Sequence, residues 1–431
     1  MNLRKLYYNT VVRIFDENLL FKSFYKEILP ELSSDERRLF INMVNNFFRH
    51  FRYVEKIFIE RVEKKIDRDK YLVVMLLLSA GCEWLYLDKS KSYAIVNEYV
   101  EIAKKRFGSF KAGFVNAVLR KFIKLDKEEL LANQEDIYIS HPEWFINEIK
   151  KSYTPKIARE ILKFNQEIPK TYIRHNRTKT TVKRLLADLE SRNIEAKKVK
   201  QFPDYICVKK GNIFDIDLFE KGEFYIQSPS HSLPIKLLNP VKGEKILDIC
   251  SAPGGKSTHI QEITFNKVKL FLNDISMKKR VKIKHNFKRL GLSFEKLTFQ
   301  EGEKFKLFMD FDKILIDAPC SGTGNFGKHP EARWNRDKED IEDLIKLQYK
   351  ILDNASYYLK INGTIIYSTC SILDSENIKV VEKFTKNNPD FIIEKPSEEF
   401  DKYRYKDNYL LVNPGISRLD GGFCCKIRRI R

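Results

Sequence analysis

The sequence predicts a multidomain protein: an all-α bundle, then a helical linker with a small α/β module, then an α/β domain. Three observations predict this order. Apolar residues recur at helical spacing near the N-terminus, short strand-like and helix-like pieces alternate in the middle, and β-branched strands alternate with helices from Gly222 onward. A chain of 431 residues can bury two or three separate cores. We therefore place the domains at residues 1–130, 131–225 and 226–431.

The first domain is predicted to be a compact helical bundle. Ser33 and Glu36 have the spacing of a capping box in front of a long helix. That helix carries an apolar stripe at three- or four-residue steps: Leu39, Met43, Phe47, Phe51, Val54 and Phe58. Further helices are expected over residues 71–87, 94–105 and 114–125, with Gly108 and Gly113 separating the last two.

Cysteine usage and apolar patterning indicate a cytoplasmic protein. Seven cysteines are an odd and sparse set without a C-x-x-C pair, so we expect free thiols, no disulfide framework and no metal site. The N-terminus lacks the apolar core of a signal peptide. The apolar stretch 71–87 contains Gly81 and Glu83, which favours a buried bundle helix over a membrane segment.

The net charge of +20 predicts a polyanionic partner, because neutralised phosphates release counterions. A lysine-rich solvated surface and an anionic membrane surface are the alternatives. Cations on the predicted bundle helices are either solvated or in contact with RNA: Arg37, Arg38, Arg49, Arg52, Lys104, Lys105, Arg106, Arg120 and Lys121.

The middle of the chain is predicted to form a small α/β module. A helical pattern over 141–164 precedes a strand at 171–174, a helix at 181–193 and a strand at 204–208. The polar residues 174–179 (Arg-His-Asn-Arg-Thr-Lys) are suited to phosphate contact.

The last domain is predicted to contain a parallel sheet covered on both faces. Short apolar strands are expected at 245–249, 269–272, 313–316 and 364–367, with helices between them. Ligands bind at the carboxyl ends of the strands in such sheets, and every motif described next falls at such an end.

A glycine-rich turn follows the first of these strands. It consists of Cys250, Ser251, Ala252, Pro253, Gly254, Gly255 and Lys256. A P-loop would need glycine at position 250, and Pro253 would remove a backbone donor, so the pattern excludes that loop. Asp274 ends the next strand, where a carboxylate can accept hydrogen bonds from ribose hydroxyls. A cofactor with ribose but no phosphate fits, and S-adenosylmethionine is one, with Lys256 complementing its carboxylate; an ordinary strand-to-helix turn is the alternative.

Two further cysteines follow predicted strands, Cys320 within residues 317–324 (Asp-Ala-Pro-Cys-Ser-Gly-Thr-Gly) and Cys370 within 367–371 (Tyr-Ser-Thr-Cys-Ser). A nucleotide-binding turn and two thiols on one sheet edge indicate transient covalent attack on a pyrimidine ring. The remaining cysteines are expected to be small buried residues: Cys82, Cys207, Cys424 and Cys425.

These three motifs resemble the signatures of the NOL1/NOP2/Sun RNA cytosine-C5 methyltransferases. The bundle resembles NusB, with Asp88, residues 97–98 and residues 113–120 in the expected order, and residues 413–415 and 420–423 look like the family's last strands. The resemblance covers essentially the whole chain and points to the bacterial RsmB/Sun branch. It implies a NusB-like RNA-binding bundle, a Rossmann-like methyltransferase domain, S-adenosyl-L-methionine as cofactor and 16S ribosomal RNA as partner, in a monomer.

The resemblance also implies roles for individual residues. Cys370 of the T-C-S motif is the nucleophile that adds to cytosine carbon 6, and Cys320 assists release of the adduct; the residues alone leave open which thiol attacks. Asp317 is expected to hydrogen-bond the ring as a general acid. The cofactor site takes residues 250–256, Asp274 and Asp317, and Glu303 stands where the family usually has an aspartate for the adenine amine.

Three expectations complete this picture. Arg333 and Arg336 are expected to approach the RNA backbone around a flipped cytidine, and Trp334 to pack in a core. Methylation of an exocyclic nitrogen is a second enzymatic reading, but residues 318–320 lack the aromatic side chain that such enzymes use, and Cys370 would have no role. A non-catalytic RNA-binding or ribosome-assembly factor is a third reading, which accounts for the charge but not for the thiols.

Overall fold

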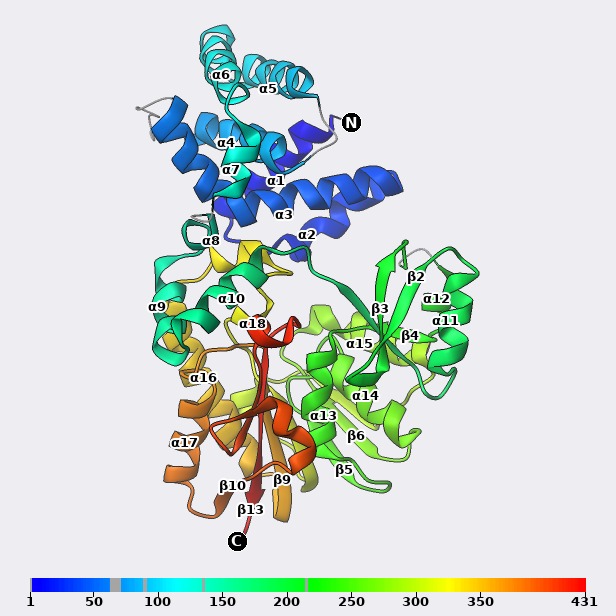
Figure 1. The fold of residues 1–431 in the computed structure, drawn as a ribbon. Helices are drawn as coiled ribbons and strands as arrows, with labels where there is room; N and C mark the ends of the chain where they lie inside the picture. The colour runs from blue at the N-terminus through cyan, green and yellow to red at the C-terminus, as the bar shows by residue number, and fades with distance from the viewer. Residues whose placement is uncertain (1, 63–70, 88–90, 134–135, 214–215) are drawn as a thin grey trace. The chain divides into compact units, whose positions relative to one another are not determined.

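The computed structural model describes residues 2–62, 71–87, 91–133, 136–213 and 216–431. Contacts divide the chain into two compact units (Figure 1). The first contains residues 1–167 and 326–337, and the second contains residues 168–325 and 338–431. Asp88, which contributes to the resemblance to NusB, lies outside the described residues.

The first unit is helical, as predicted. Its helices are α1 (Leu3–Asp16), α2 (Phe21–Ile28), α3 (Ser34–Ile57), α4 (Tyr71–Tyr86), α5 (Ser92–Phe107), α6 (Ser109–Phe122), α7 (Lys127–Ala132), α8 (Asp136–Ile139), α9 (Glu143–Ser152) and α10 (Pro155–Gln166). The capping box at Ser33 and Glu36 is present, and the apolar stripe of α3 is buried apart from Leu39, which is half-buried. Within the described chain, no helix combines the length and the apolarity needed to cross a membrane.

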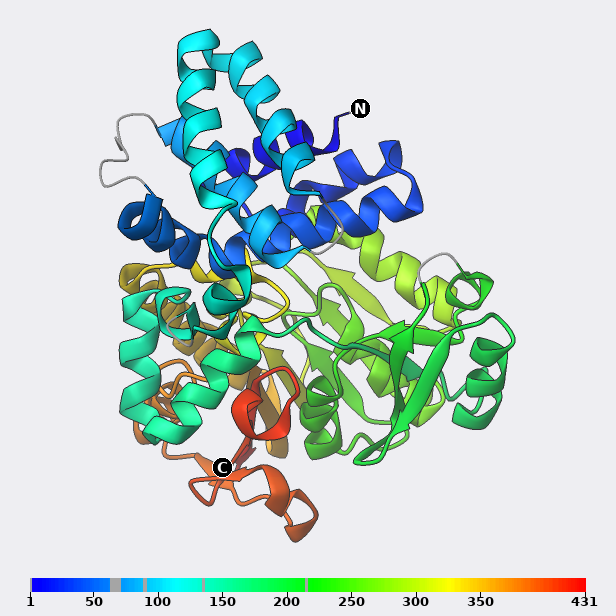
Figure 2. The ribbon, with the colours of Figure 1, turned by 45° about the horizontal axis from the view of Figure 1, so that its top comes forward.

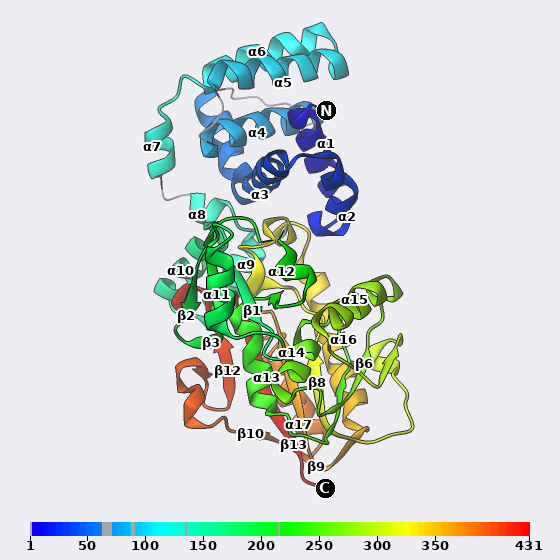
Figure 3. The ribbon, with the colours of Figure 1, turned by 90° about the vertical axis from the view of Figure 1, so that its right-hand side faces the viewer.

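Helices α5 and α6 form a hairpin, and they lie side by side in Figures 2 and 3. Gly108 ends α5 with φ at +85°, a backbone conformation that glycine adopts without strain. The sequence predicts the second helix from residue 114, but α6 begins at Ser109 and contains Gly113. One left-handed residue is enough to turn the chain, so Gly113 remains helical.

Residues 326–337 belong to the helical unit although they lie between the two cysteine motifs in the sequence. Arg333 is fully buried and donates to three backbone carbonyls, those of Ser140, Asn165 and Phe326. The expectation that Arg333 reaches RNA is therefore wrong. Trp334 packs as predicted: its ring lies 4.9 Å from that of Phe51.

Arg49 also differs from its predicted place on a solvent-facing or RNA-facing surface. It is 3% exposed, and its guanidinium donates to the carbonyl of Gly327 at 2.8 Å. Burial lowers its pKa to about 10, with Glu331 opposing that shift. Arg49 is thus part of the interior of the helical unit.

The second unit begins with a small antiparallel sheet in the order β2-β3-β1-β4. Its strands are β1 (Thr171–His175), β2 (Glu195–Val199), β3 (Phe202–Lys210) and β4 (Phe224–Ile226), with helices α11 (Val182–Glu190) and α12 (Asp217–Glu220). The predicted strands at 171–174 and 204–208 and the helix between them are confirmed.

The large sheet of the second unit is mixed, where the sequence predicts a parallel one. The predicted strands are present as β5 (Lys245–Asp248), β6 (Lys269–Asn273), β8 (Phe311–Asp317) and β9 (Leu359–Thr369), all parallel, with β7 (Lys296–Thr298) beside β6. Antiparallel strands extend it beyond β9: β13 (Gly422–Arg429), β12 (Tyr409–Val412), β11 (Arg404–Tyr405) and β10 (Phe391–Glu394). In Figure 1, β13 (red) runs beside β9 (orange).

Helices cover both faces of this sheet. On one face lie α13 (Leu233–Leu238), α14 (Gly255–Thr264) and α15 (Arg280–Leu290), and on the other α16 (Lys338–Ser356) and α17 (Ile378–Asn387) (Figure 1). The short α18 (Pro414–Ser417) precedes β13. Because β5, β6, β8 and β9 are parallel, the residues that follow them meet at one edge of the sheet.

Candidate active site

The glycine-rich turn connects β5 to α14. Gly254 caps α14 with φ at +97°, and a Cβ on Gly255 would lie 3.0 Å from Gln227 Nε2, so both positions suit glycine. The backbone N–H of Ser251 donates to Asn273 O at 2.8 Å. These contacts hold the turn closely against the end of β6.

Asp274 lies directly after β6 and joins the two turns. One of its carboxylate oxygens accepts the N–H of Ala252 at 3.0 Å, and the other accepts the N–H of Ser276 at 2.9 Å. Asp274 is 6% exposed. A buried carboxylate fixed by two backbone donors is a rigid acceptor that still has lone pairs for a ligand hydroxyl.

Carboxylates converge on the turn from several strands. Burial raises the pKa of Cys250 far above its ordinary value, and nearby carboxylates raise it further: Asp248, Asp317, Asp274 and Glu303. Burial likewise raises the pKa of Asp248 to about 7, against a hydrogen bond from Ser257, and its Oδ1 has no hydrogen-bond partner among the described residues. An acidic edge of this kind fits a positively charged ligand, and the sulfonium of S-adenosylmethionine is such a group.

Lys256 supplies the opposing charge. Its Nζ lies 2.5 Å from Asp317 Oδ2, at the end of β8. Burial alone would lower the pKa of Lys256, but the ion pair with Asp317 outweighs burial and raises it. The lysine therefore stays protonated and pairs with a side chain of the protein, and its contact with a cofactor carboxylate stays a prediction.

Cys320 and Cys370 meet at the same edge. Their sulfur atoms are 3.2 Å apart, and both are free thiols. The hydrogen bond from Cys320 lowers the pKa of Cys370; burial and Asp317 oppose this shift, and Lys256 supports it. That same hydrogen bond, together with burial, raises the pKa of Cys320. The pair thus consists of one sulfur that favours the thiolate and one that favours the thiol.

The loops that carry these cysteines are joined by backbone contacts. The N–H of Gly324 donates to Cys370 O at 2.9 Å, and the N–H of Ala318 donates to Ser368 O at 2.9 Å. A Cβ on Gly324 would lie 2.7 Å from Cys370 O. The loop after β8 can therefore approach the loop after β9 only with glycine at position 324.

Glu376 and Asn377 are buried beside the cysteine loops, and neither is predicted from the sequence as a site residue. An acid and an amide in a loop are typical of a solvated turn, so these residue types carried no signal of their own. Both residues lie a short distance after the T-C-S motif in the sequence, and this proximity is the one sequence feature that indicates a role at the site.

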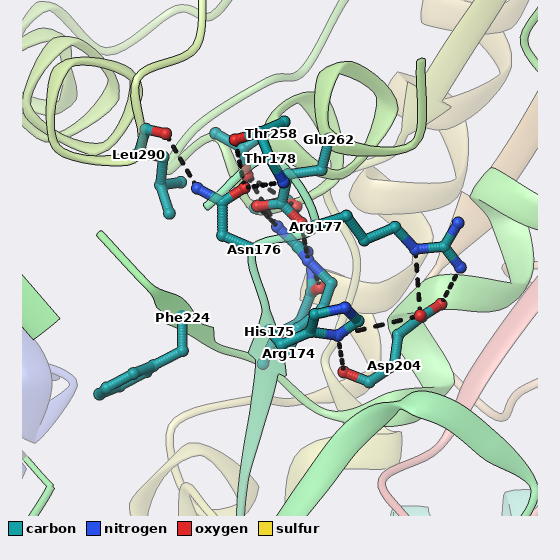
Figure 4. A network of polar contacts seen from close by, with 12 residues as sticks. Arg174, His175, Asn176, Arg177, Thr178, Asp204, Phe224, Thr258, Glu262 and Leu290 are labelled. Carbon is teal, nitrogen blue, oxygen red and sulfur yellow. Dashed lines mark hydrogen bonds and ion pairs between the residues drawn. The ribbon is translucent and has the colours of Figure 1, made fainter. Parts of the chain in front are cut away.

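The segment 174–179 is structural in large part, contrary to the predicted phosphate contact (Figure 4). Arg174 is fully buried and donates two parallel hydrogen bonds to Glu262, at 2.7 and 2.8 Å. Asn176 is also buried and donates to the carbonyls of Gly222 and Leu290. Arg177 is exposed and pairs with Asp204 at 2.6 Å. The donors of Arg174 and Asn176 that a phosphate would need are therefore already bonded to other groups of the protein.

Three family models match successive parts of the chain. The model of the NusB family matches residues 1–124. An RsmF/B-like ferredoxin-like domain matches residues 141–214, and the model described as 16S rRNA methyltransferase RsmB/F matches residues 235–428.

Similar curated proteins extend over nearly the whole chain. A probable ribosomal RNA small subunit methyltransferase B of Bacillus subtilis is 33% identical over 428 residues, which covers 96% of this chain and 94% of that protein. The ribosomal RNA small subunit methyltransferase B of Shewanella oneidensis is 29% identical and covers 99% of both chains.

Solved structures share the fold. The crystal structure of PH0851 has a TM-score of 0.81 at 21% identity and covers 100% of this chain and 99% of its own. NSun6 from Pyrococcus horikoshii has a TM-score of 0.62 at 21% identity and covers 67% of this chain and 98% of its own.

Proposed function

The chain belongs to the 16S rRNA methyltransferase RsmB/F family, and we propose that it methylates carbon 5 of a cytosine in 16S ribosomal RNA. It is a ribosomal RNA methyltransferase, and its methyl donor is S-adenosyl-L-methionine. The observation that carries the carbon-5 chemistry is the 3.2 Å contact between the Cys320 and Cys370 sulfur atoms. A methyl transfer to an exocyclic nitrogen has no use for a second thiol.

Cys370 is proposed as the nucleophile. Carbon 5 of cytosine becomes nucleophilic only after a thiolate has added to carbon 6, and an ordinary thiol with a pKa of about 8.5 is mostly protonated at neutral pH. The pKa of Cys370 is lowered, first by the hydrogen bond from Cys320 and, among further causes, by the positive charge of Lys256. These contacts favour the reactive form of Cys370 and the protonated form of Cys320.

Asp317 and Lys256 are proposed to supply the proton that the ring needs. Addition of Cys370 places negative charge on the ring, which a proton on N3 neutralises. The side chain of Asp317 is 33% exposed and can face the base, and its Oδ2 lies 2.5 Å from the Lys256 ammonium. A proton passed from Lys256 through Asp317 to N3 leaves an enamine whose carbon 5 can accept a methyl group.

Cys320 is proposed to act in release. Once Cys370 is bonded to carbon 6 it is a thioether, and the hydrogen bond that most strongly raises the pKa of Cys320 is lost. Cys320 can then lose its proton to water and, as a thiolate, remove the proton from carbon 5. The electrons of that C–H bond restore the C5–C6 double bond, and the bond to Cys370 breaks, which returns Cys370 as a thiolate. The proton on N3 returns through Asp317 to Lys256, so that the ring leaves neutral.

The cofactor site is proposed at the acidic edge around the glycine-rich turn. S-adenosyl-L-methionine supplies a methyl carbon activated by a positively charged sulfur. Asp274 would hold the ribose hydroxyls, the turn at residues 250–256 would hold the rest of the cofactor, and Glu303 would accept a hydrogen bond from the adenine amine. The carboxylates that raise the pKa of Cys250 also favour the positive charge of the sulfonium.

Two substitutions test the assignment of the thiols. Cys370→Ala abolishes methyl transfer from labelled cofactor to 16S RNA, because no adduct forms. Cys320→Ala traps the adduct as a protein–RNA band that survives denaturing electrophoresis. Cys207→Ala, a buried position in the small α/β module, is the matched control and retains turnover. Full activity of the Cys370 variant would overturn the proposed mechanism.

The product distinguishes the two methylation chemistries. Mass spectrometry of digested nucleosides should find 5-methylcytidine in RNA treated with this protein. A methyl group on the exocyclic nitrogen instead would remove the need for the thiol pair and contradict the proposal.

A further inference from the structure

The turn after β9 carries two adjacent polar side chains that are both buried. Glu376 is 0% exposed and Asn377 is 1% exposed. Although they are neighbours in the chain, they contact different loops. Glu376 contacts the loop that carries Cys320, and Asn377 contacts the loop that carries Cys370.

Glu376 holds the residues next to Cys320. Its Oε1 accepts the backbone N–H of Ser321 at 2.8 Å, and its Oε2 accepts the Ser321 hydroxyl at 2.5 Å. Gln348 Nε2 donates to Glu376 Oε1 at 3.0 Å and to Pro319 O at 2.9 Å. Since Pro319 and Ser321 flank Cys320, Glu376 and Gln348 together fix both of its peptide neighbours.

Asn377 makes the equivalent contacts around Cys370. Its Oδ1 accepts the Thr369 hydroxyl at 2.6 Å, and its Nδ2 donates to Ser371 O at 3.0 Å. Thr369 and Ser371 flank Cys370. A single short turn therefore contacts the neighbours of both sulfur atoms, with one side chain for each.

We infer that Glu376 is the positioning residue for Cys320 and Asn377 is the positioning residue for Cys370. Release of the adduct then depends on Glu376, and attack on the ring depends on Asn377, the next residue of the same turn. This inference rests on the proposed function, because it assigns the two side chains to the two steps of that reaction.

Charge distinguishes the two positions as well as geometry. Glu376 is an acid whose three donors are neutral, and charge-assisted hydrogen bonds of this kind are the stronger ones. After the hydrogen bond to Cys370 and burial, the negative charge of Glu376 adds to the raised pKa of Cys320, and it also opposes the lowering of the pKa of Cys370. Asn377 is neutral, so its effect on Cys370 is one of geometry alone.

The inference predicts opposite kinetic defects for two neighbouring substitutions. In Glu376→Ala, the loop of Cys320 loses two hydrogen bonds and Gln348 loses a third, and a displacement of about 1 Å slows a catalysed step by about 10²-fold. Release should slow by that factor and the covalent band should accumulate. In Asn377→Ala, formation of the band should slow instead, and the band should not accumulate.

The experiment is a single-turnover assay with the full-length protein, labelled cofactor and a 16S RNA transcript. Band formation and band decay are followed on denaturing gels for each variant. Melting curves and cofactor binding of each variant show whether it is folded. Glu376→Gln, which keeps the shape of the side chain, carries the test if Glu376→Ala does not fold.

Glu376→Gln also changes the pH dependence of the release rate, which a purely structural role of Glu376 would leave unchanged. Removing the negative charge lowers the pKa of Cys320, so the acid limb of the release rate should move to lower pH. Asn377→Ala should leave that limb in place. Equal slowing of formation and release in both variants, or an unmoved limb in Glu376→Gln, would overturn the inference.

The proposed function and this inference fail in different ways. If Cys370→Ala keeps its activity, the proposed function fails whatever Glu376 does. If Cys370→Ala is inactive and Cys320→Ala traps the adduct, while both neighbour variants share one defect, only the division between Glu376 and Asn377 fails.

Discussion

Helix α14 contributes to two ion pairs that differ in how far they are buried. Near its start, Lys256 pairs with Asp317, and these side chains are 10% and 33% exposed. Near its end, Glu262 pairs with Arg174 of β1, and these side chains are 1% and 0% exposed. Both pairs join α14 to a strand of the second unit, but they differ in solvent access and in the number of further hydrogen bonds.

The Arg174 pair is saturated by its surroundings. Figure 4 shows Arg174 beside Glu262 and Thr258. Besides Glu262, the guanidinium contacts Thr258 Oγ1, Gly255 O and Gln227 Oε1, so its donors are occupied. Glu262 raises the pKa of Arg174 against the effect of burial, and the arginine stays charged. The Asp317 carboxylate, by contrast, is partly open at the end of β8 and lies close to Cys370. A saturated buried pair stabilises the fold, whereas an open pair beside a thiol can take part in chemistry.

The largest expected effect is on stability at the saturated pair. Arg174→Met leaves Glu262 buried without its partner, which costs about 3–5 kcal/mol in the free energy of unfolding. Denaturant titration of the variant beside the parent protein measures this. Methyl transfer per folded molecule should fall less than in Lys256→Met, although the glycine-rich turn loses the hydrogen bond from Arg174 to Gly255 O. A variant as stable as the parent would show that the pair is not structural.

The next effect is on catalysis at the open pair. Lys256→Met removes the proton source for Asp317 and the cation that favours the Cys370 thiolate, so methyl transfer should fall by about 10²-fold or more. The free energy of unfolding should change little, because water can reach the Asp317 carboxylate. Single-turnover rates and denaturant titration of the same preparation give both values. If Lys256→Met lost stability but kept its turnover, the Lys256–Asp317 pair would be structural and our assignment of it to catalysis would be wrong.

The pH dependence of the rate provides a smaller and more specific test. In the parent protein, the pKa of Cys370 is lowered by the hydrogen bond from Cys320 and, among further causes, by Lys256. Without the cation the thiolate is less favoured and the pKa rises. The acid limb of the methyl-transfer rate in Lys256→Met should therefore move to higher pH, with partial recovery of the rate in alkaline buffer. In Arg174→Met the limb should stay in place.

The smallest effect is expected at an exposed pair in the same basic segment. Arg177 is 40% exposed and pairs with Asp204 at 2.6 Å. Exposed ion pairs contribute about 0–1 kcal/mol, so Arg177→Ala should unfold almost as the parent does. The difference between the Arg174 and Arg177 variants then measures what burial adds. A large loss of stability in Arg177→Ala would mean that the segment as a whole, and not burial, is responsible.

Much of the candidate site could be predicted because its residues end neighbouring strands. The turn at residues 250–256, Asp274, Cys320 and Cys370 each follow a strand whose apolar pattern is evident in the sequence, and Asp317 is the last residue of such a strand. Parallel strands place their carboxyl ends along one edge, so order in the sequence implies proximity in space. The structure places these residues at that edge.

Other residues could not be placed in this way. The run at residues 174–179 has the composition of a phosphate site, but Arg174 and Asn176 are buried by contacts that come from distant segments. Arg333 lies between the cysteine motifs in sequence, yet it donates to carbonyls of the helical unit. Glu376 has the residue type of a surface loop and is buried. In each case the outcome depends on which donors and acceptors arrive from elsewhere in the chain.

The sequence by itself determined the four parallel strands, the residue types at the strand ends and the presence of two thiols beside a nucleotide-type turn. Periodicity and turn chemistry act over a few residues, so they are readable along the chain. Only the tertiary structure decided which charged groups have all their hydrogen-bond partners inside the protein and which remain open to solvent. It also decided that Glu376 contacts the neighbours of one sulfur atom and Asn377 those of the other. Burial and hydrogen-bond partners are properties of packing, and packing brings together residues that are far apart in the sequence.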